Sequence, residues 1–169
     1  MKPIIITTLG LFMLVAAGCN SGLDQQSATK VMTSALTGTG AAQAQLKPMN
    51  GATNASFDGT IQNPAGTGSA HVPGSATSTS NGWSVVIDVT FDHWTDLASN
   101  VTLTGALHES ASFSTMSPLV GSVKITGNLA ATGSVQSSVD FDLAVDYSPT
   151  KYQVVGNVGG ASLNLDVNL

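Results

Sequence analysis

Large apolar residues occupy every second position between residues 83 and 91, and mostly polar residues stand between them. Successive side chains of a β-strand point to opposite faces, so this period of two predicts a strand with one buried and one solvent-facing side. The same alternation extends over residues 135–147, with three aspartates on the polar side. A run longer than a typical strand predicts a tall or curved sheet.

The last part of the chain contains a predicted hairpin. Gly159 and Gly160 form a two-glycine loop, and both residues can adopt the positive φ that tight hairpin turns require. Counting outward from this turn pairs Val154 with Leu165 and places the apolar residues of both strands on one face. The alternation of apolar residues in both strands is therefore consistent with the register that the turn predicts.

A weak repeat indicates how the strands follow one another. The motif apolar, any, Gly, any, apolar occurs at residues 57–61, 103–107, 125–129 and 154–158. A glycine inside a strand marks a bend, or a place where a neighbouring ring lies across the gap, and Trp94 and Tyr147 are the candidate rings. The repeated unit of strand, aromatic corner and glycine-bearing strand predicts a meander.

A different period appears before the strands. Asp24 can cap a helix, and the apolar residues between positions 28 and 36 recur at helical spacing. Gly38 and Gly40 are expected to end this helix after about three turns. The Ala-, Gln- and Asn-rich stretch 41–55 is expected to be a linker of low order or an extended strand leading into the sheet.

These patterns together predict an all-β fold. We expect an antiparallel meander of about eight to ten strands, forming a barrel or a curved half-barrel, with one short N-terminal helix that plugs or caps one end. The expected organisation is a signal peptide at 1–18, a lipidated cysteine with tether, short helix and linker at 19–55, and a β-meander domain at 56–169.

The charged residues restrict the classes of partner. The chain has five basic residues, all Lys, against ten acidic residues, and it contains no Arg. No basic patch is expected to neutralise phosphates, so nucleic acid is excluded as a partner. Anionic ligands are disfavoured as well, because the chain has no Arg guanidinium group to bind a carboxylate or phosphate through two hydrogen bonds.

The first segment of the chain has the pattern of an export signal. Met1-Lys2 provides a short cationic region, and residues 3–15 form an apolar run that is too short to span a membrane. The run ends in Val15-Ala-Ala-Gly-Cys19, which resembles the lipobox of bacterial lipoproteins, with Ala16 where Leu is usual. The resemblance implies cleavage before Cys19, a thioether-linked diacylglycerol on that residue and anchoring in a bilayer. Asn20 in place of Asp after the cysteine implies outer-membrane delivery.

Other candidate chemistry is sparse. The three histidines, His71, His93 and His108, have no metal-site spacing and are expected to lie on the solvated surface. The aspartates of the 135–147 strand are too widely spaced for a tight calcium cage and are expected to keep that face soluble. No nucleophile elbow or phosphate loop is present. We therefore expect no catalytic residues, no cofactor and no metal, and Cys19 is the single predicted site.

The function expected from these features is that of a non-enzymatic, membrane-anchored envelope lipoprotein, which serves as an interaction or structural module with a protein partner. The alternative is a carrier that holds a lipid or another small apolar ligand inside a β-barrel. Two further classes stay open: a transmembrane barrel, although aromatic girdles are missing, and an enzyme whose site is assembled from loops.

Overall fold

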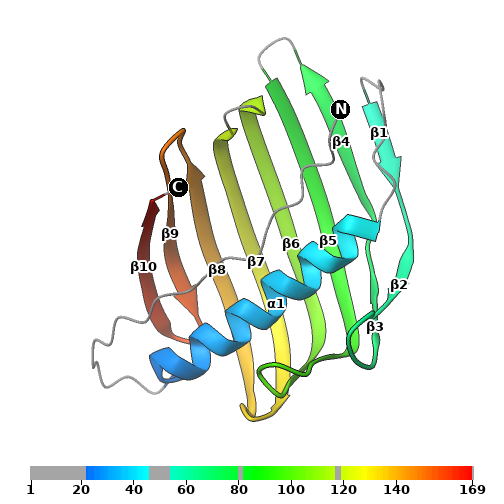
Figure 1. Ribbon diagram of the computed structural model, residues 1–169, viewed down its shortest axis with the longest axis vertical. Helices are drawn as coiled ribbons and strands as arrows, with labels where there is room; N and C mark the ends of the chain where they lie inside the picture. The colour runs from blue at the N-terminus through cyan, green and yellow to red at the C-terminus, as the bar shows by residue number, and fades with distance from the viewer. Residues whose placement is uncertain (1–21, 46–53, 80–81, 117–118, 169) are drawn as a thin grey trace.

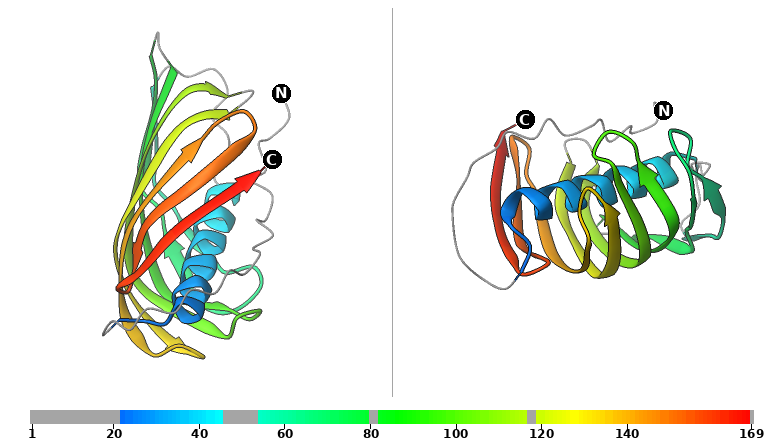
Figure 2. Two further views of the ribbon diagram at one scale, coloured as in Figure 1. Left: turned by 90° about the vertical axis from the view of Figure 1, so that its left-hand side faces the viewer. Right: turned by 90° about the horizontal axis from the view of Figure 1, so that it is seen from below.

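The chain folds into one curved antiparallel sheet with a helix lying in its hollow (Figures 1 and 2). This computed structural model describes residues 22–45, 54–79, 82–116 and 119–168. The helix is α1 (Gln25–Gln45), and the strands are β1 (Asn54–Phe57), β2 (Thr60–Gln62), β3 (Ser69–His71), β4 (Gly74–Thr79), β5 (Gly82–Asp96), β6 (Val101–Met116), β7 (Leu119–Gly133), β8 (Ser137–Tyr147), β9 (Lys151–Val158) and β10 (Ala161–Asn168). The predicted all-β class with one N-terminal helix is confirmed. Because β1 and β10 do not pair with each other, the sheet is a curved half-barrel.

The strand order confirms the predicted meander from β4 to β10, where each strand pairs with the next one in the sequence. The first strands depart from it: β1 pairs with β4, and the β2–β3 hairpin joins the sheet through β3 and β5. The C-terminal hairpin has the predicted register, in which Val154 lies opposite Leu165. Strand β8 begins at Ser137, two residues later than the alternation begins.

Three glycines of the predicted repeat lie in strands and have the conformation of strand bends. Gly105, Gly127 and Gly156 have φ values of 133°, 144° and 146°. A Cβ at each would lie within 2.5 Å of a carbonyl oxygen of the neighbouring strand, so the close approach of the strands depends on glycine. The fourth repeat glycine, Gly59, lies between β1 and β2.

The rings opposite these glycines differ from the expected ones. Phe91 is paired with Gly105 and Phe141 with Gly127, whereas Trp94 is paired with Leu103. A bulge between Phe91 and Trp94 shifts the register of β5 against β6 by one residue, so Trp94 is buried on the same face as Phe91 but lies opposite Leu103. This irregularity has no signal in the alternation of apolar residues.

Helix α1 begins where it was predicted and ends later. The Asp24 carboxylate accepts hydrogen bonds from the Ser27 amide at 2.8 Å and from the Ser27 hydroxyl at 2.9 Å, and the amide hydrogen bond lowers the pKa of Asp24 below its ordinary value. The expected stop at Gly38 is wrong, because the helix continues to Gln45. Gly38 serves packing instead: a Cβ there would lie 2.9 Å from ring atoms of both Phe91 and Trp94.

Candidate functional site

The inward-facing side chains of the half-barrel form rows across the strands, and we call this surface the concave face. Helix α1 crosses its lower half as drawn in Figure 1. Gly38 of the helix lies against Phe91 and Trp94 of β5, and Ser34 donates a hydrogen bond to Asp96 at the lower end of that strand at 2.8 Å. The helix therefore covers the rows near the lower ends of the strands.

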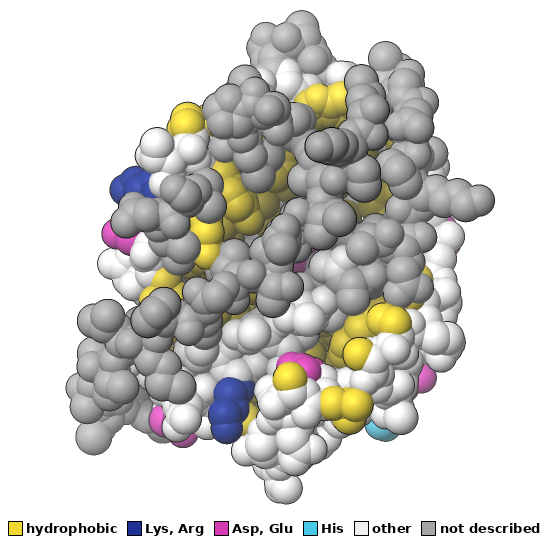
Figure 3. Space-filling model, viewed as in Figure 1, with side chains coloured by type: hydrophobic (Ala, Val, Ile, Leu, Met, Phe, Trp, Pro, Cys, Tyr) yellow, Lys and Arg dark blue, Asp and Glu magenta, His cyan; other side chains and the backbone are white. Residues whose placement is uncertain are grey.

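Two rows lie towards the upper ends of the strands, and we call them the valine row and the aromatic row. By the strand pairing, the valine row consists of Val85, Ala111, Val123, Val145, Val154 and Leu165. The aromatic row consists of Trp83, Phe113, Gly121, Tyr147 and Tyr152. Figure 3 shows hydrophobic side chains gathered above the helix on this side of the molecule.

The aromatic row is held together by ring contacts over a glycine. The Phe113 and Tyr147 ring centroids are 6.2 Å apart, and those of Tyr147 and Tyr152 are 5.9 Å apart. Gly121 lies between Phe113 and Tyr147 in the sheet, and a Cβ at this position would lie 2.6 Å from the Phe113 ring. Glycine thus leaves room for the two rings to meet across β7.

Glu109 and Tyr152 bring buried polar groups to this largely apolar surface. Glu109 is 9% exposed and pairs in the sheet with Ile87 and Ile125, both of which are buried. Desolvation by burial, and secondly the charge of Glu109, raise the pKa of Tyr147. Tyr152 is 4% exposed, and its hydroxyl has no hydrogen-bond partner among the described residues. A buried hydroxyl without a partner is costly.

Neither of these two residues was predicted from the sequence as part of a site. The outward orientation expected for His108 implied an inward side chain at Glu109, and this signal could have identified it. The pairing of Tyr152 with Tyr147 follows from the turn between β8 and β9, whose register the alternation alone does not determine.

The histidines lie on the outer surface, as expected, and each is close to an aspartate. His71 lies 2.6 Å from Asp58, His93 lies 2.6 Å from Asp92, and His108 lies 2.7 Å from Asp88. Their side chains are 48%, 78% and 50% exposed. Exposed pairs of this kind contribute little to stability.

The aspartates of β8 also face outward. Asp140 accepts a hydrogen bond from Asn128 at 2.7 Å, and Asp142 pairs with Lys124. Over the described ranges, no three side chains of the His, Cys, Asp or Glu types come together as a metal site would require. Cys19, the predicted lipidation site, lies outside the described residues, as does the proposed signal peptide.

Comparisons with known proteins identify no relative. No family model matches the chain, and no curated protein or solved structure is significantly similar to it. In the part of the chain that the structure describes, no helix combines the length and the hydropathy that crossing a bilayer requires.

Proposed function

We propose that this protein is a lipid-anchored bacterial envelope protein whose half-barrel holds an apolar ligand on the valine and aromatic rows. The observation that carries the proposal is the part of the concave face that α1 does not cover. Val85, Ala111 and Val123 remain only half-buried there, and Trp83 is 38% exposed. A contiguous apolar surface in water is unfavourable, and it is typical of a binding site.

The polar groups on this face define the chemistry of the ligand. The inward-facing side chains of the described strands include Glu109 but no Lys, and the chain has no Arg. A ligand carboxylate or phosphate would find no Lys among the inward-facing side chains of the described strands, so removing its charge from water there would be costly. The proposed ligand is therefore an apolar molecule whose polar group is uncharged.

The anchor is proposed from the first segment of the sequence. The apolar run followed by Ala16-Ala-Gly-Cys19 supports export, cleavage and acylation at Cys19, and Asn20 supports delivery to the outer membrane. The intact mass of protein from the membrane fraction tests this step. We expect the mass of residues 19–169 plus acyl groups, and loss of the acyl groups in Cys19→Ser; an unacylated mature chain in both samples would refute the anchor.

We propose a binding role without catalysis, because the described polar side chains on this face do not include a nucleophile next to its base. Glu109 lies in the row of Ile87 and Ile125, whereas Tyr147 and Tyr152 lie in the aromatic row two rows above. A hydrogen-bonded acid and base, with a third group to orient them, is the arrangement that acyl or phosphoryl transfer requires. The three groups suit recognition of a polar group instead.

A matched pair of alanine substitutions tests ligand binding. Ala111 lies in the valine row between Val85 and Val123, whereas Ala130 is exposed on the outer face. We expect Ala111→Trp to abolish binding of monoolein, measured by displacement of a fluorescent hydrophobic dye, and Ala130→Trp to leave it unchanged. Oleate should compete more weakly than monoolein because of its carboxylate. Equal binding by both variants would refute the proposed site.

Protein interaction is a second candidate function, and the open sheet favours it. Strand β10 ends the sheet and pairs only with β9 among the described strands. An edge strand offers unpaired backbone groups to which a partner strand can add. Size-exclusion chromatography with light scattering tests self-association through this edge: a monomer at all concentrations would exclude a second copy as the partner.

A further inference from the structure

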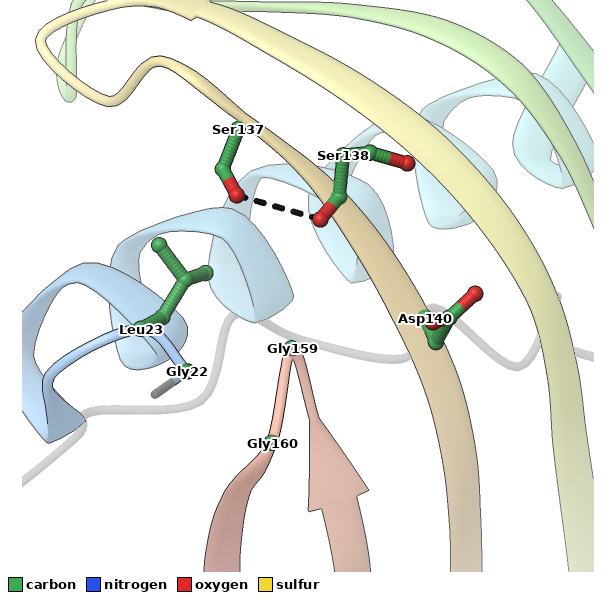
Figure 4. A pocket seen from close by; sticks show the side chains of 7 residues that line it. All are labelled: Gly22, Leu23, Ser137, Ser138, Asp140, Gly159 and Gly160. Atoms are coloured by element: carbon green, nitrogen blue, oxygen red, sulfur yellow. Dashed lines mark hydrogen bonds between the residues drawn. The ribbon is translucent and has the colours of Figure 1, made fainter. Parts of the chain in front are cut away.

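Gly22 and Leu23, which precede helix α1, contact one edge of the sheet. The Leu23 amide donates a hydrogen bond to the Gly159 carbonyl at 2.8 Å. The Leu23 side chain also packs on this turn, since a Cβ at Gly159 would lie 2.8 Å from it. Figure 4 shows Gly22 and Leu23 beside Gly159 and Gly160, at a shallow hollow of about 590 Å³. The start of α1 is therefore attached to the turn between β9 and β10.

This turn belongs to what we call the lower edge of the sheet. In an antiparallel meander alternate connections lie at the same edge, so residues 97–100, 134–136 and 159–160 share it (Figure 1). The connection between β8 and β9, residues 148–150, lies at the opposite, upper edge. The aromatic row lies near that upper edge.

The length of the tether decides which edge is close to the lipid. Gly22 follows Cys19 by three residues, and three extended residues span at most about 11 Å. Strand β6 has 16 residues, which corresponds to about 50 Å of extended chain. A lipid on Cys19 would therefore hold the lower edge at the bilayer, and the tether cannot place the upper edge there instead unless the body lies flat.

The lower edge also carries an exposed hydrophobic side chain, which favours contact with a bilayer. Leu97, in the turn between β5 and β6, is 67% exposed, the most exposed large hydrophobic residue described. The outer face carries exposed aspartates, among them Asp88, Asp140 and Asp142, which the negative surface of a bilayer would repel. An upright body brings Leu97 to the headgroups and keeps the acidic outer face in water.

We infer that the lower edge of the half-barrel rests against the headgroups of the anchoring bilayer and that the part of the concave face that α1 leaves uncovered points away from it. The inference rests on the proposed acylation of Cys19 and is independent of ligand binding. Its consequence is directional: a ligand enters and leaves on the side away from the anchoring membrane, by exchange with another carrier or with a facing membrane.

Two labels on the acylated protein in vesicles test this orientation. Thioether formation consumes the Cys19 thiol, so an introduced cysteine is the one reactive site. Ala98→Cys places a bimane label at the lower edge and Thr150→Cys places it at the upper edge; both residues are exposed. With nitroxide-labelled headgroups in phosphatidylethanolamine–phosphatidylglycerol vesicles, we expect several-fold stronger quenching at position 98 than at position 150.

The outcomes separate the orientation from the anchor. Equal quenching at both positions, or stronger quenching at position 150, would overturn the orientation while an acylated mass upholds the anchor. An unacylated protein that does not float with vesicles would overturn both. Insertion of twenty Gly and Ser residues after Ser21 extends the tether to about 25 Å and should reduce the contrast between the labels. An unchanged contrast would refute the tether as its cause.

Discussion

The contact between α1 and β5 yields a prediction from two glycines of the same helix. Gly38 lies against Phe91 and Trp94, which are 1% and 3% exposed, whereas a Cβ at Gly40 would meet no atom within 4 Å. Each Gly→Ala change gains about 1 kcal/mol of helix propensity. At position 38 the new methyl group would lie 2.9 Å from both rings, and displacing packed rings costs about 1–3 kcal/mol.

We therefore expect Gly40→Ala to raise the free energy of unfolding by about 1 kcal/mol and Gly38→Ala to leave it unchanged or lower it by up to about 2 kcal/mol. Urea unfolding of the mature chain carrying Cys19→Ser measures both values, and the thermal midpoint should move by about 2–4 °C per kcal/mol. Equal stabilisation by both substitutions would refute the packing of Gly38 against the rings.

Three further substitutions test other parts of the structure. The Asp96 carboxylate accepts hydrogen bonds from Ser34 and Ser99, so Asp96→Ala should lower stability by about 1–3 kcal/mol at pH 7. Burial tends to raise the pKa of Asp96, but the hydrogen bonds lower it overall; the difference from wild type, followed by urea unfolding, should therefore shrink below about pH 4. Burial, and secondly Glu109, raise the pKa of Tyr147, so wild-type stability should fall above about pH 10, and Tyr147→Phe should reduce that fall in alkaline denaturation. A Cβ at Gly127 would lie 2.3 Å from a carbonyl oxygen at a φ of 144°, so Gly127→Ala should cost about 2–4 kcal/mol in the same urea assay, and a neutral effect would contradict the strand bend.

The parts of the fold that the sequence predicts are those with a local signal. Alternation identified the two faces of β5 and β8, the Gly159-Gly160 turn determined the register of β9 and β10, and Asp24 marked the start of α1. Each of these signals involves residues close together in the chain, where side-chain direction or turn geometry acts directly.

The features that could not be predicted depend on contacts between distant segments. The end of α1 was misplaced because a helix glycine is equally consistent with a stop and with close packing, and the rings against Gly38 come from residues more than fifty positions later. The bulge in β5 and the branch through β2 and β3 also have no periodic signal. Which rows of the concave face the helix leaves uncovered depends on where it crosses the sheet. That position is set by tertiary packing and has no local signal in the sequence.

Native mass spectrometry of the mature chain carrying Cys19→Ser, purified without added lipid, tests the central proposal most directly. We expect a species heavier than the bare chain by one apolar molecule, absent from Ala111→Trp and retained in Ala130→Trp. Bare chain alone in all three samples, together with no binding of added monoolein, would contradict a ligand-binding role for the concave face.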